Sequence, residues 1–161
     1  MNIEGTHYRS IWRDAGGIVQ VIDQRWLPHE LRVVPLKSLQ DFADAIRDMW
    51  VRGAPLIGAT ATYGIAVQMA ADPSDESLDH GWDVLHDTRP TAINLRWALE
   101  RMLEALRNQP PERRAEAAYA EADQQEARAA LIRATRRMAT MLSDVTAHGY
   151  VFRTDLRLRV A

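Results

Sequence analysis

Residues 52–58, with the sequence RGAPLIG, lead from a turn into the stretch that decides the fold. Gly53 permits backbone conformations that other residues avoid, and Pro55 favours the first turn of a helix. The residues that follow, 56–71, are almost all apolar or small. A helix that is apolar on every face is typical of the buried centre of a domain. A stretch of about 16 residues is also too short to span a bilayer. These residues therefore predict a central core helix.

Helical patterns flank this stretch on both sides. Ser38 is expected to cap a helix whose apolar stripe runs from Phe42 to Trp50 and which ends at Gly53 and Pro55. Downstream, three further helices are expected, at residues 78–87, 92–108 and 112–141. The last is rich in Ala, Glu and Arg and carries a sparse apolar stripe, which predicts a partly exposed helix.

The first third of the chain favours strands. The runs at 10–13 and 18–22 flank Asp14-Ala15-Gly16-Gly17, a strong signal for a hairpin turn. A second pair of extended segments is expected over 23–36, where Pro28 and Pro35 restrict the strands to sheet edges or strand ends. The sequence therefore predicts an α+β fold, in which a small antiparallel sheet precedes a helical bundle.

The composition excludes several classes of protein. The chain has 47% apolar and 26% charged residues, which suits a globular domain rather than a disordered one. The net charge is −2 and basic residues do not cluster, so no nucleic-acid partner is expected. Without cysteine, disulfides, thiol nucleophiles and cysteine-bound zinc are excluded. The five histidines lack ligand spacing and no phosphate-loop motif occurs, so we expect neither metal nor cofactor. A polar N-terminus and the lack of a long apolar run predict a cytoplasmic protein without a membrane partner.

An arginine precedes a predicted helix start in two places. Arg52 stands before Gly53 and Ala54, whose small side chains would leave the first helical amides accessible. Arg89 lies in Thr88-Arg89-Pro90-Thr91, where Pro90 suits a first helical position. Free amides, the positive end of a helix dipole and a forked guanidinium together suit a phosphate. Each motif also fits a plain corner between helices with a solvated arginine. A shared anion site requires both helix starts to lie at one end of the domain.

The sequence resembles the N-terminal part of the S-methyl-5-thioribose-1-phosphate isomerases, a methionine-salvage family related to the α, β and δ subunits of initiation factor 2B. Three phrases in the same order carry this resemblance: IDQRWLPHE at 22–30, IRDMWVRGAPLIG at 46–58 and TRPTAINLRWA at 88–98. The resemblance implies that Arg52, Gly53, Ala54 and Arg89 contact a sugar-phosphate substrate. It also implies a larger Rossmann-like domain after the helices, and homodimers.

The family reaction converts an aldose 1-phosphate into a ketose 1-phosphate, and the resemblance places its acid–base pair, a cysteine and an aspartate, in the Rossmann-like domain. This chain has no cysteine and nothing similar to the family's continuation after about residue 133. We therefore expect no catalytic residue, no Rossmann-like domain and no activity in the chain alone. The expected organisation is a sheet over 1–36, a helical domain over 37–133 and an atypical tail over 134–161. Truncation, a frameshift or a separately encoded C-terminal half would each account for that tail.

Two other functions remain open from the sequence. One is a non-catalytic module that senses a sugar phosphate or nucleotide and contacts proteins, as in the initiation factor 2B relatives. The other is isomerisation of ribose 1,5-bisphosphate. A downstream reading frame that carries the cysteine and aspartate motifs would favour the isomerase portion over the sensor.

Overall fold

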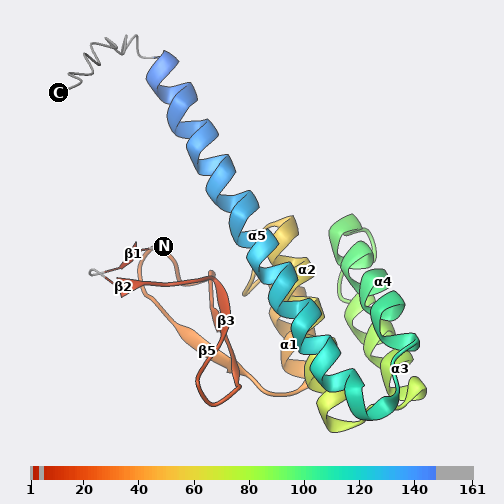
Figure 1. Ribbon diagram of the computed structural model, residues 1–161. Helices are drawn as coiled ribbons and strands as arrows, with labels where there is room; N and C mark the ends of the chain where they lie inside the picture. The colour runs from red at the N-terminus through yellow and green to blue at the C-terminus, as the bar shows by residue number, and fades with distance from the viewer. Residues whose placement is uncertain (1, 4–5, 148–161) are drawn as a thin grey trace, which may run out of the picture. The chain divides into compact units, whose positions relative to one another are not determined.

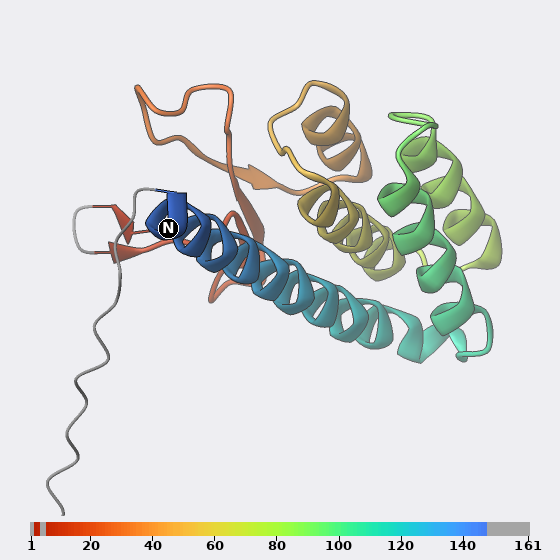
Figure 2. The same cartoon turned by 90° about the horizontal axis from the view of Figure 1, so that it is seen from above.

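Helix α2, Ala54–Ala71, forms the centre of the fold. It lies between helix α4 and the three-stranded sheet in both views (Figures 1 and 2). Twelve of its eighteen residues are buried, which confirms the predicted core helix. Its contacts extend to strand β3 and to three helices: α1, Leu39–Arg47; α3, Asp75–His86; and α4, Ile93–Arg107.

The structure is a computed structural model that describes residues 2–3 and 6–147. The chain divides into two units, one ending at Ala130 and one beginning at Leu131. Helix α5, Pro111–Ala147, is longer than the predicted 112–141. Residues 148–161, half of the predicted atypical tail, lie outside the described residues, and the predicted domain boundaries stay predictions. In the part of the chain that is described, no helix combines the length and apolarity that a membrane crossing needs.

The sheet is antiparallel, with strand order β3-β4-β5 and bounds Ile11–Arg13, Val19–Ile22 and Val33–Leu36. The predicted hairpin between β3 and β4 is confirmed. Its turn is held by Asp14, whose Oδ1 accepts the amides of Gly16 and Ile18 at 2.9 and 3.0 Å. Pro35 lies on the edge strand β5, as its missing amide donor requires. A separate pair of short strands, β1 (Asn2–Ile3) and β2 (Thr6–His7), was not predicted.

The expected second pair of strands is wrong in its first member. Residues 23–32 form a series of turns, and only Val33–Leu36 pairs with β4. The cause is Asp23, a buried side chain that binds Arg25 instead of continuing the strand. Arg25 Nε and Nη2 donate to Asp23 Oδ1 and Oδ2 at 2.9 and 2.7 Å, and this short-range pair closes the turn.

The Asp23–Arg25 pair predicts a pH dependence. The hydrogen bond from Arg25 lowers the pKa of the Asp23 carboxyl from its ordinary value of 3.8. The stabilisation is therefore complete above that value and is lost as the pH falls through the lower pKa of the folded state. We expect Asp23→Asn to lower the free energy of unfolding near neutral pH, with a difference from the wild type that shrinks below about pH 3.8. Urea unfolding across this range measures it, and a constant difference would contradict the assignment.

Helix α1 begins as predicted and ends earlier than predicted. Ser38 and Asp41 form a reciprocal capping box at its start. The helix stops at Arg47 because Met49 adopts a φ of 59°, in the left-handed region, so the stripe does not continue through Met49 and Trp50. The amide of Trp50 then bonds the carbonyl of Ala45 at 3.0 Å. Residues 48–53 consequently form a tight connection between α1 and α2.

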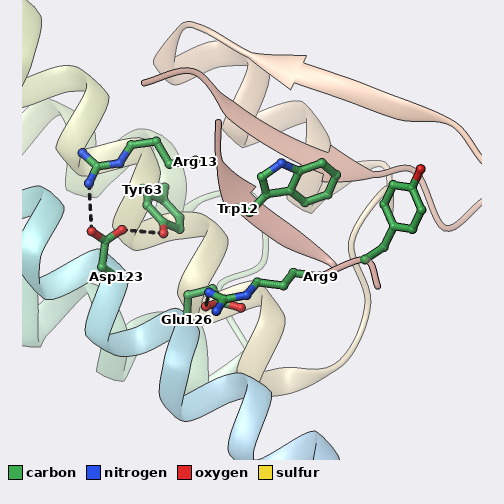
Figure 3. A pocket seen from close by; sticks show the side chains of 7 residues that line it. Arg9, Trp12, Arg13, Tyr63, Asp123 and Glu126 are labelled. Atoms are coloured by element: carbon green, nitrogen blue, oxygen red, sulfur yellow. Dashed lines mark hydrogen bonds and ion pairs between the residues drawn. The ribbon is translucent and has the colours of Figure 1, made fainter. Parts of the chain in front are cut away.

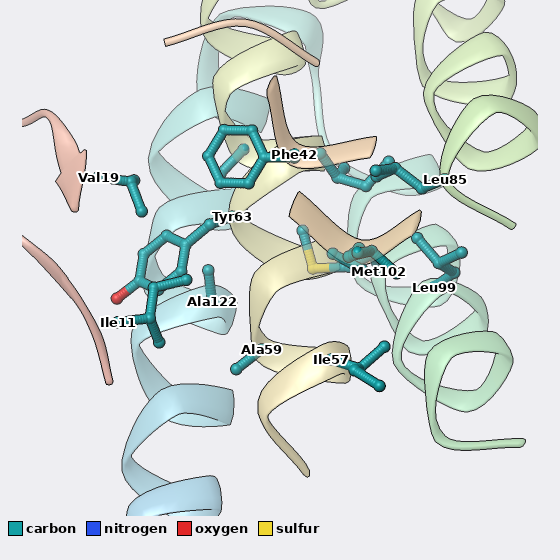
Figure 4. Close-up of a cluster of buried hydrophobic side chains, with 14 of the residues drawn as sticks. Ile11, Val19, Phe42, Ile57, Ala59, Tyr63, Leu85, Leu99, Met102 and Ala122 are labelled. Carbon is teal, nitrogen blue, oxygen red and sulfur yellow. The ribbon is translucent and has the colours of Figure 1, made fainter. Parts of the chain in front are cut away.

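The hydrophobic core joins the sheet to the bundle through α2 (Figure 4). Ile11 and Val19 of the sheet lie on one side of α2, and Leu99 and Met102 of α4 lie on the other. Within the unit that ends at Ala130, helix α5 contributes small side chains that allow close packing: Ala118, Ala122 and Ala129 are buried. The α+β fold predicted from the sequence is thus confirmed.

Candidate anion-binding site

A cavity of about 460 Å³ lies where helices α2 and α4 begin. Its lining is formed by short or apolar side chains and a single charged residue. No lining residue is acidic, so the formal charge of the wall is positive. The lining residues are Gly53, Ala54, Ile57, Arg89, Thr91, Ala92, Ile93, Asn94 and Leu95.

The start of α2 presents main-chain donors to this cavity. Gly53 precedes the helix with φ 90° and ψ 134°, a conformation that disfavours any residue with a Cβ. The carbonyl of Gly53 accepts the amides of Leu56 and Ile57 at 3.0 and 3.1 Å, and Pro55 has no amide hydrogen. Among the described residues, no side chain caps this helix and the amide of Ala54 has no partner. The Ala54 amide is therefore available to a ligand.

The start of α4 repeats this arrangement. The carbonyl of Ala92 accepts the amides of Leu95 and Arg96, and no side chain caps the helix. In the described part of the chain, the amides of Ile93 and Asn94 remain without partners. Both helix starts face one cavity, so their free amides and positive dipole ends act on the same space.

The role expected for Pro90 is wrong. Helix α4 begins at Ile93, three residues after Pro90, because a turn intervenes in which the Ala92 amide bonds the Arg89 carbonyl at 2.9 Å. Thr88, the polar residue at the start of this motif, closes the preceding helix and does not cap α4. Its hydroxyl donates to the carbonyl of Leu85 at 2.6 Å and so closes the end of α3. Arg89 consequently lies before this turn, and it lines the same cavity as Ile93 and Asn94.

Close packing holds the two helix starts together. A Cβ built at Gly58 would lie 3.2 Å from both the Asn94 carbonyl oxygen and Ala98 Cβ. Any larger residue would therefore push α4 away from α2. Because Asn94 lines the cavity, Gly58 sets the spacing between the two sets of amides.

The structure brings together three of the four residues that the sequence nominated. Gly53, Ala54 and Arg89 line the cavity, whereas Arg52 is exposed and does not line it. Neither arginine side chain has a hydrogen bond or ion pair among the described residues. That these residues contact substrate stays a prediction. Ile57, Thr91, Ala92, Ile93 and Leu95 were not nominated, because their types carry no chemical signal without the spatial arrangement.

The chemistry of the lining residues suits anion binding better than proton transfer. None of them is a histidine, an acid, a cysteine or a lysine, so no side chain of the wall can act as a general base near neutral pH. Within the described residues, no group of three or more histidines and acids is arranged to hold a metal ion. The arrangement supports electrostatic binding of a phosphate or carboxylate.

Backbone strain at Gly53 gives a testable prediction. A Cβ at this position would meet no atom within 4 Å, so Gly53→Ala would cost conformational energy without a clash. We expect a loss of about 1–3 kcal/mol in the free energy of unfolding. Gly17→Ala is the matched control, since Gly17 also has a positive φ, 82°, and open space, but lies in the β3–β4 turn. Both variants should lose stability in urea unfolding, and only Gly53→Ala should also weaken phosphate binding. Equal phosphate affinity in the two variants would contradict a role for the Gly53 turn.

A second cavity, of about 660 Å³, lies between strand β3 and helix α5 (Figure 3). The Tyr63 hydroxyl donates to Asp123 Oδ1 at 2.7 Å, and Arg13 donates to Asp123 Oδ2 at 2.9 Å. Arg9 pairs with the buried Glu126 at 2.8 Å. Burial, followed by the contact with Asp123, raises the pKa of the Tyr63 phenol. Both arginines are neutralised by acids of α5, so this cavity is a junction between sheet and helix. Sequence reasoning missed this junction because the last helix was expected only to be partly exposed, with no partner for its acids.

The fold is an α+β domain with a cavity, a candidate anion site, where helices α2 and α4 begin. Residues 50–155 match the Initiation factor 2 subunit family, and the chain belongs to that family. It is 68% identical over 118 residues to methylthioribose-1-phosphate isomerase of Cereibacter sphaeroides, a match that covers 73% of this chain and 32% of the relative. The enzyme of the same name from Sinorhizobium medicae is 63% identical over 120 residues, covering 74% and 33%. The chain thus spans about a third of the length of these curated relatives.

Two solved structures share the fold. The subunit delta of translation initiation factor eIF-2B from A. fulgidus matches with a TM-score of 0.67 and 37% identity, covering 74% of this chain and 36% of that one. The 5-methylthioribose 1-phosphate isomerase of Pyrococcus horikoshii matches with a TM-score of 0.62 and 34% identity, covering 73% and 36%. Both identities are high enough to support common family membership as well as a common fold.

Proposed function

We propose that this chain is the N-terminal portion of an aldose–ketose isomerase and binds the phosphate of 5-methylthioribose 1-phosphate. In methionine salvage, the complete enzyme would convert this substrate into 5-methylthioribulose 1-phosphate. The observation that carries the proposal is the shared cavity. Two helix starts with free amides line it together with Arg89, and none of its described lining residues is an acid. The relatives with 56–68% identity that carry the isomerase name supply the substrate class.

Within this proposal, the chain's residues bind and orient the substrate. The amides of Ala54, Ile93 and Asn94 would donate to phosphate oxygens, and Arg89 would add a forked, charged contact. The apolar wall at Ile57 and Leu95 would exclude water from one side of the sugar. Arg52, exposed beside the cavity, would contribute a weaker contact or steer the anion inward.

Proton transfer would require another polypeptide segment. Isomerisation moves a proton between neighbouring carbons and oxygens, which needs an acid and a base within hydrogen-bond reach. The cavity wall provides neither, and the chain has no cysteine. We therefore expect the 161-residue chain to bind the sugar phosphate without turning it over.

The test is a calorimetric titration of the purified chain with methylthioribose 1-phosphate. Unphosphorylated methylthioribose is the matched control, and ribose 1,5-bisphosphate tests the alternative substrate. Binding that needs the phosphate would support the proposal, and equal affinity for the unphosphorylated sugar would contradict it. A parallel assay for methylthioribulose 1-phosphate checks turnover. Turnover by the chain alone would show that the chemistry uses residues other than those of the cavity.

A complementation assay tests the isomerase assignment itself. The part of the Cereibacter sphaeroides relative that lies outside the matched 118 residues would be produced separately and mixed with this chain. Activity that appears only in the mixture would support a binding half of an isomerase.

The likeness to eIF-2B subunit delta favours one second candidate, a non-catalytic module that senses a phosphorylated ligand. The same cavity would serve both roles, so binding alone does not separate them. Phosphate-dependent binding with no activity after complementation would favour the sensing module. The sequence identities to the isomerases exceed the 37% identity to the eIF-2B subunit, and for this reason the isomerase portion is the primary proposal.

A further inference from the structure

The connection that precedes the anion cavity is contacted by a loop from the sheet. The carbonyl of Trp50 accepts the amide of Gln24 at 2.8 Å, and the guanidinium of Arg25 lies 4.9 Å from the centre of the Trp50 ring. The same guanidinium donates three hydrogen bonds to the carboxylate of Asp23, which is only 2% exposed. Arg25 therefore links a buried carboxylate of the sheet region to a tryptophan near the cavity.

Trp50 lies between two residues with positive φ, in the connection that leads into α2. It stands one residue after Met49, with its φ of 59°, and three residues before Gly53, with its φ of 90°. In the part of the chain that the structure describes, the indole N–H of Trp50 has no hydrogen-bond partner. The ring is thus positioned by packing and by Arg25. Because only three residues separate them, we expect a shift of Trp50 to be passed on to Gly53 and the first amides of α2.

We propose that Arg25 is a positioning residue for the anion site, which it serves by fixing Trp50 and hence the turn that ends at Gly53. The proposal rests on the proposed function, because that function gives the Gly53 turn its role. Arg25 neither lines the cavity nor belongs to the buried core. Asp48, which follows the end of α1, also attracts the positive charge of Arg25. The Arg25 guanidinium is therefore held by Asp23 from its own loop and by Asp48 and Trp50 from the connection between α1 and α2.

A neighbouring arginine provides a matched control. Arg32 lies in the same loop, 3.5 Å from the centre of the Trp26 ring, and pairs with Glu30 at 2.8 Å. Arg32→Ala would thus remove the same kinds of contact as Arg25→Ala: an arginine–tryptophan stack and an ion pair. Because Trp26 is in the loop itself, this control leaves the 48–53 connection unchanged.

The first measurement is hydrogen exchange of the amides at 50–57 without ligand. We expect Arg25→Ala to accelerate exchange there by roughly tenfold, as loss of a stacked, charged contact allows, while exchange in α3 stays unchanged. The control Arg32→Ala should leave exchange at 50–57 as in the wild type. Equal exchange in Arg25→Ala and the wild type would overturn the proposal.

The second measurement is the affinity for inorganic phosphate. We expect Arg25→Ala to weaken it by roughly tenfold, and Arg25→Lys to recover only part of it, since lysine lacks the planar fork. Full recovery of phosphate affinity by Arg25→Lys would overturn the proposed positioning role, because a positive charge without the planar guanidinium would then be enough. A merely structural role would instead lower the thermal stability and leave the phosphate affinity of the folded protein unchanged. If the wild type does not bind phosphate, the proposed function fails, while the exchange experiment still decides the role of Arg25.

Discussion

Replacement of Phe42 by alanine is expected to lower the free energy of unfolding by about 3–5 kcal/mol. Phe42 is on α1 and is 0% exposed. It packs against α2 at Gly64, where an added Cβ would lie only 3.1 Å from Phe42 Cβ. Removal of the ring would leave a cavity at a point where α2 has no side chain to fill it. The loss therefore combines the transfer of the ring to water with the cost of an unfilled space.

Urea unfolding followed by circular dichroism measures this effect. Val33→Ala is the control, because Val33 is 40% exposed on the edge strand and its truncation should change stability by no more than about 0.5 kcal/mol. A loss below about 1 kcal/mol for Phe42→Ala would mean that α1 does not anchor the bundle as the structure indicates.

Replacement of Arg89 by alanine is expected to weaken phosphate binding by about 1.5–3 kcal/mol, or roughly 10- to 150-fold. Among the residues that the structure describes, Arg89 is the only charged one in the cavity wall. Its side chain has no ion pair or hydrogen bond among the described residues, so its loss should leave the fold intact. Arg52→Ala should have a smaller effect, because Arg52 does not line the cavity.

Calorimetric titration with methylthioribose 1-phosphate would measure the Arg89 effect, with circular dichroism to verify folding. Arg113→Ala is the matched control: Arg113 is exposed in the first turn of α5 and does not line the cavity. Equal weakening in both variants would indicate a general charge effect. Unfolding of Arg89→Ala would favour the plain corner between helices that the sequence left open.

Prediction from the sequence succeeded where the pattern is local. The apolar run of α2 and the turn Asp14-Ala15-Gly16-Gly17 depend on neighbouring residues, and both were predicted correctly. Residues 23–32 were predicted wrongly because Asp23 and Arg25 pair with each other and close a turn. The end of α1 was also wrong, since a methionine with positive φ carries no sequence signal.

The candidate site was likewise predicted only where the sequence pattern is local. Arginine, glycine and proline before a predicted helix led us to nominate Gly53, Ala54 and Arg89. That both helix starts meet in one cavity required the packing of α2 against α4, which no local pattern contains. Arg52, like Arg89, precedes a helix, but it does not line the cavity. The positive-φ turn at Gly53 changes the direction of the chain between Arg52 and the first residue of α2.

The contact at Gly58 has a consequence for how a ligand would be received. Because α2 and α4 touch there through main chain and a methyl group, the amides of their first turns are fixed before any anion arrives. A ligand would meet donors already aimed at it, and binding would consume little conformational entropy of the protein. On this view the two helix starts form a rigid binding surface. Under the proposed function, any motion needed for isomerisation would then belong to the segment that carries the acid and the base.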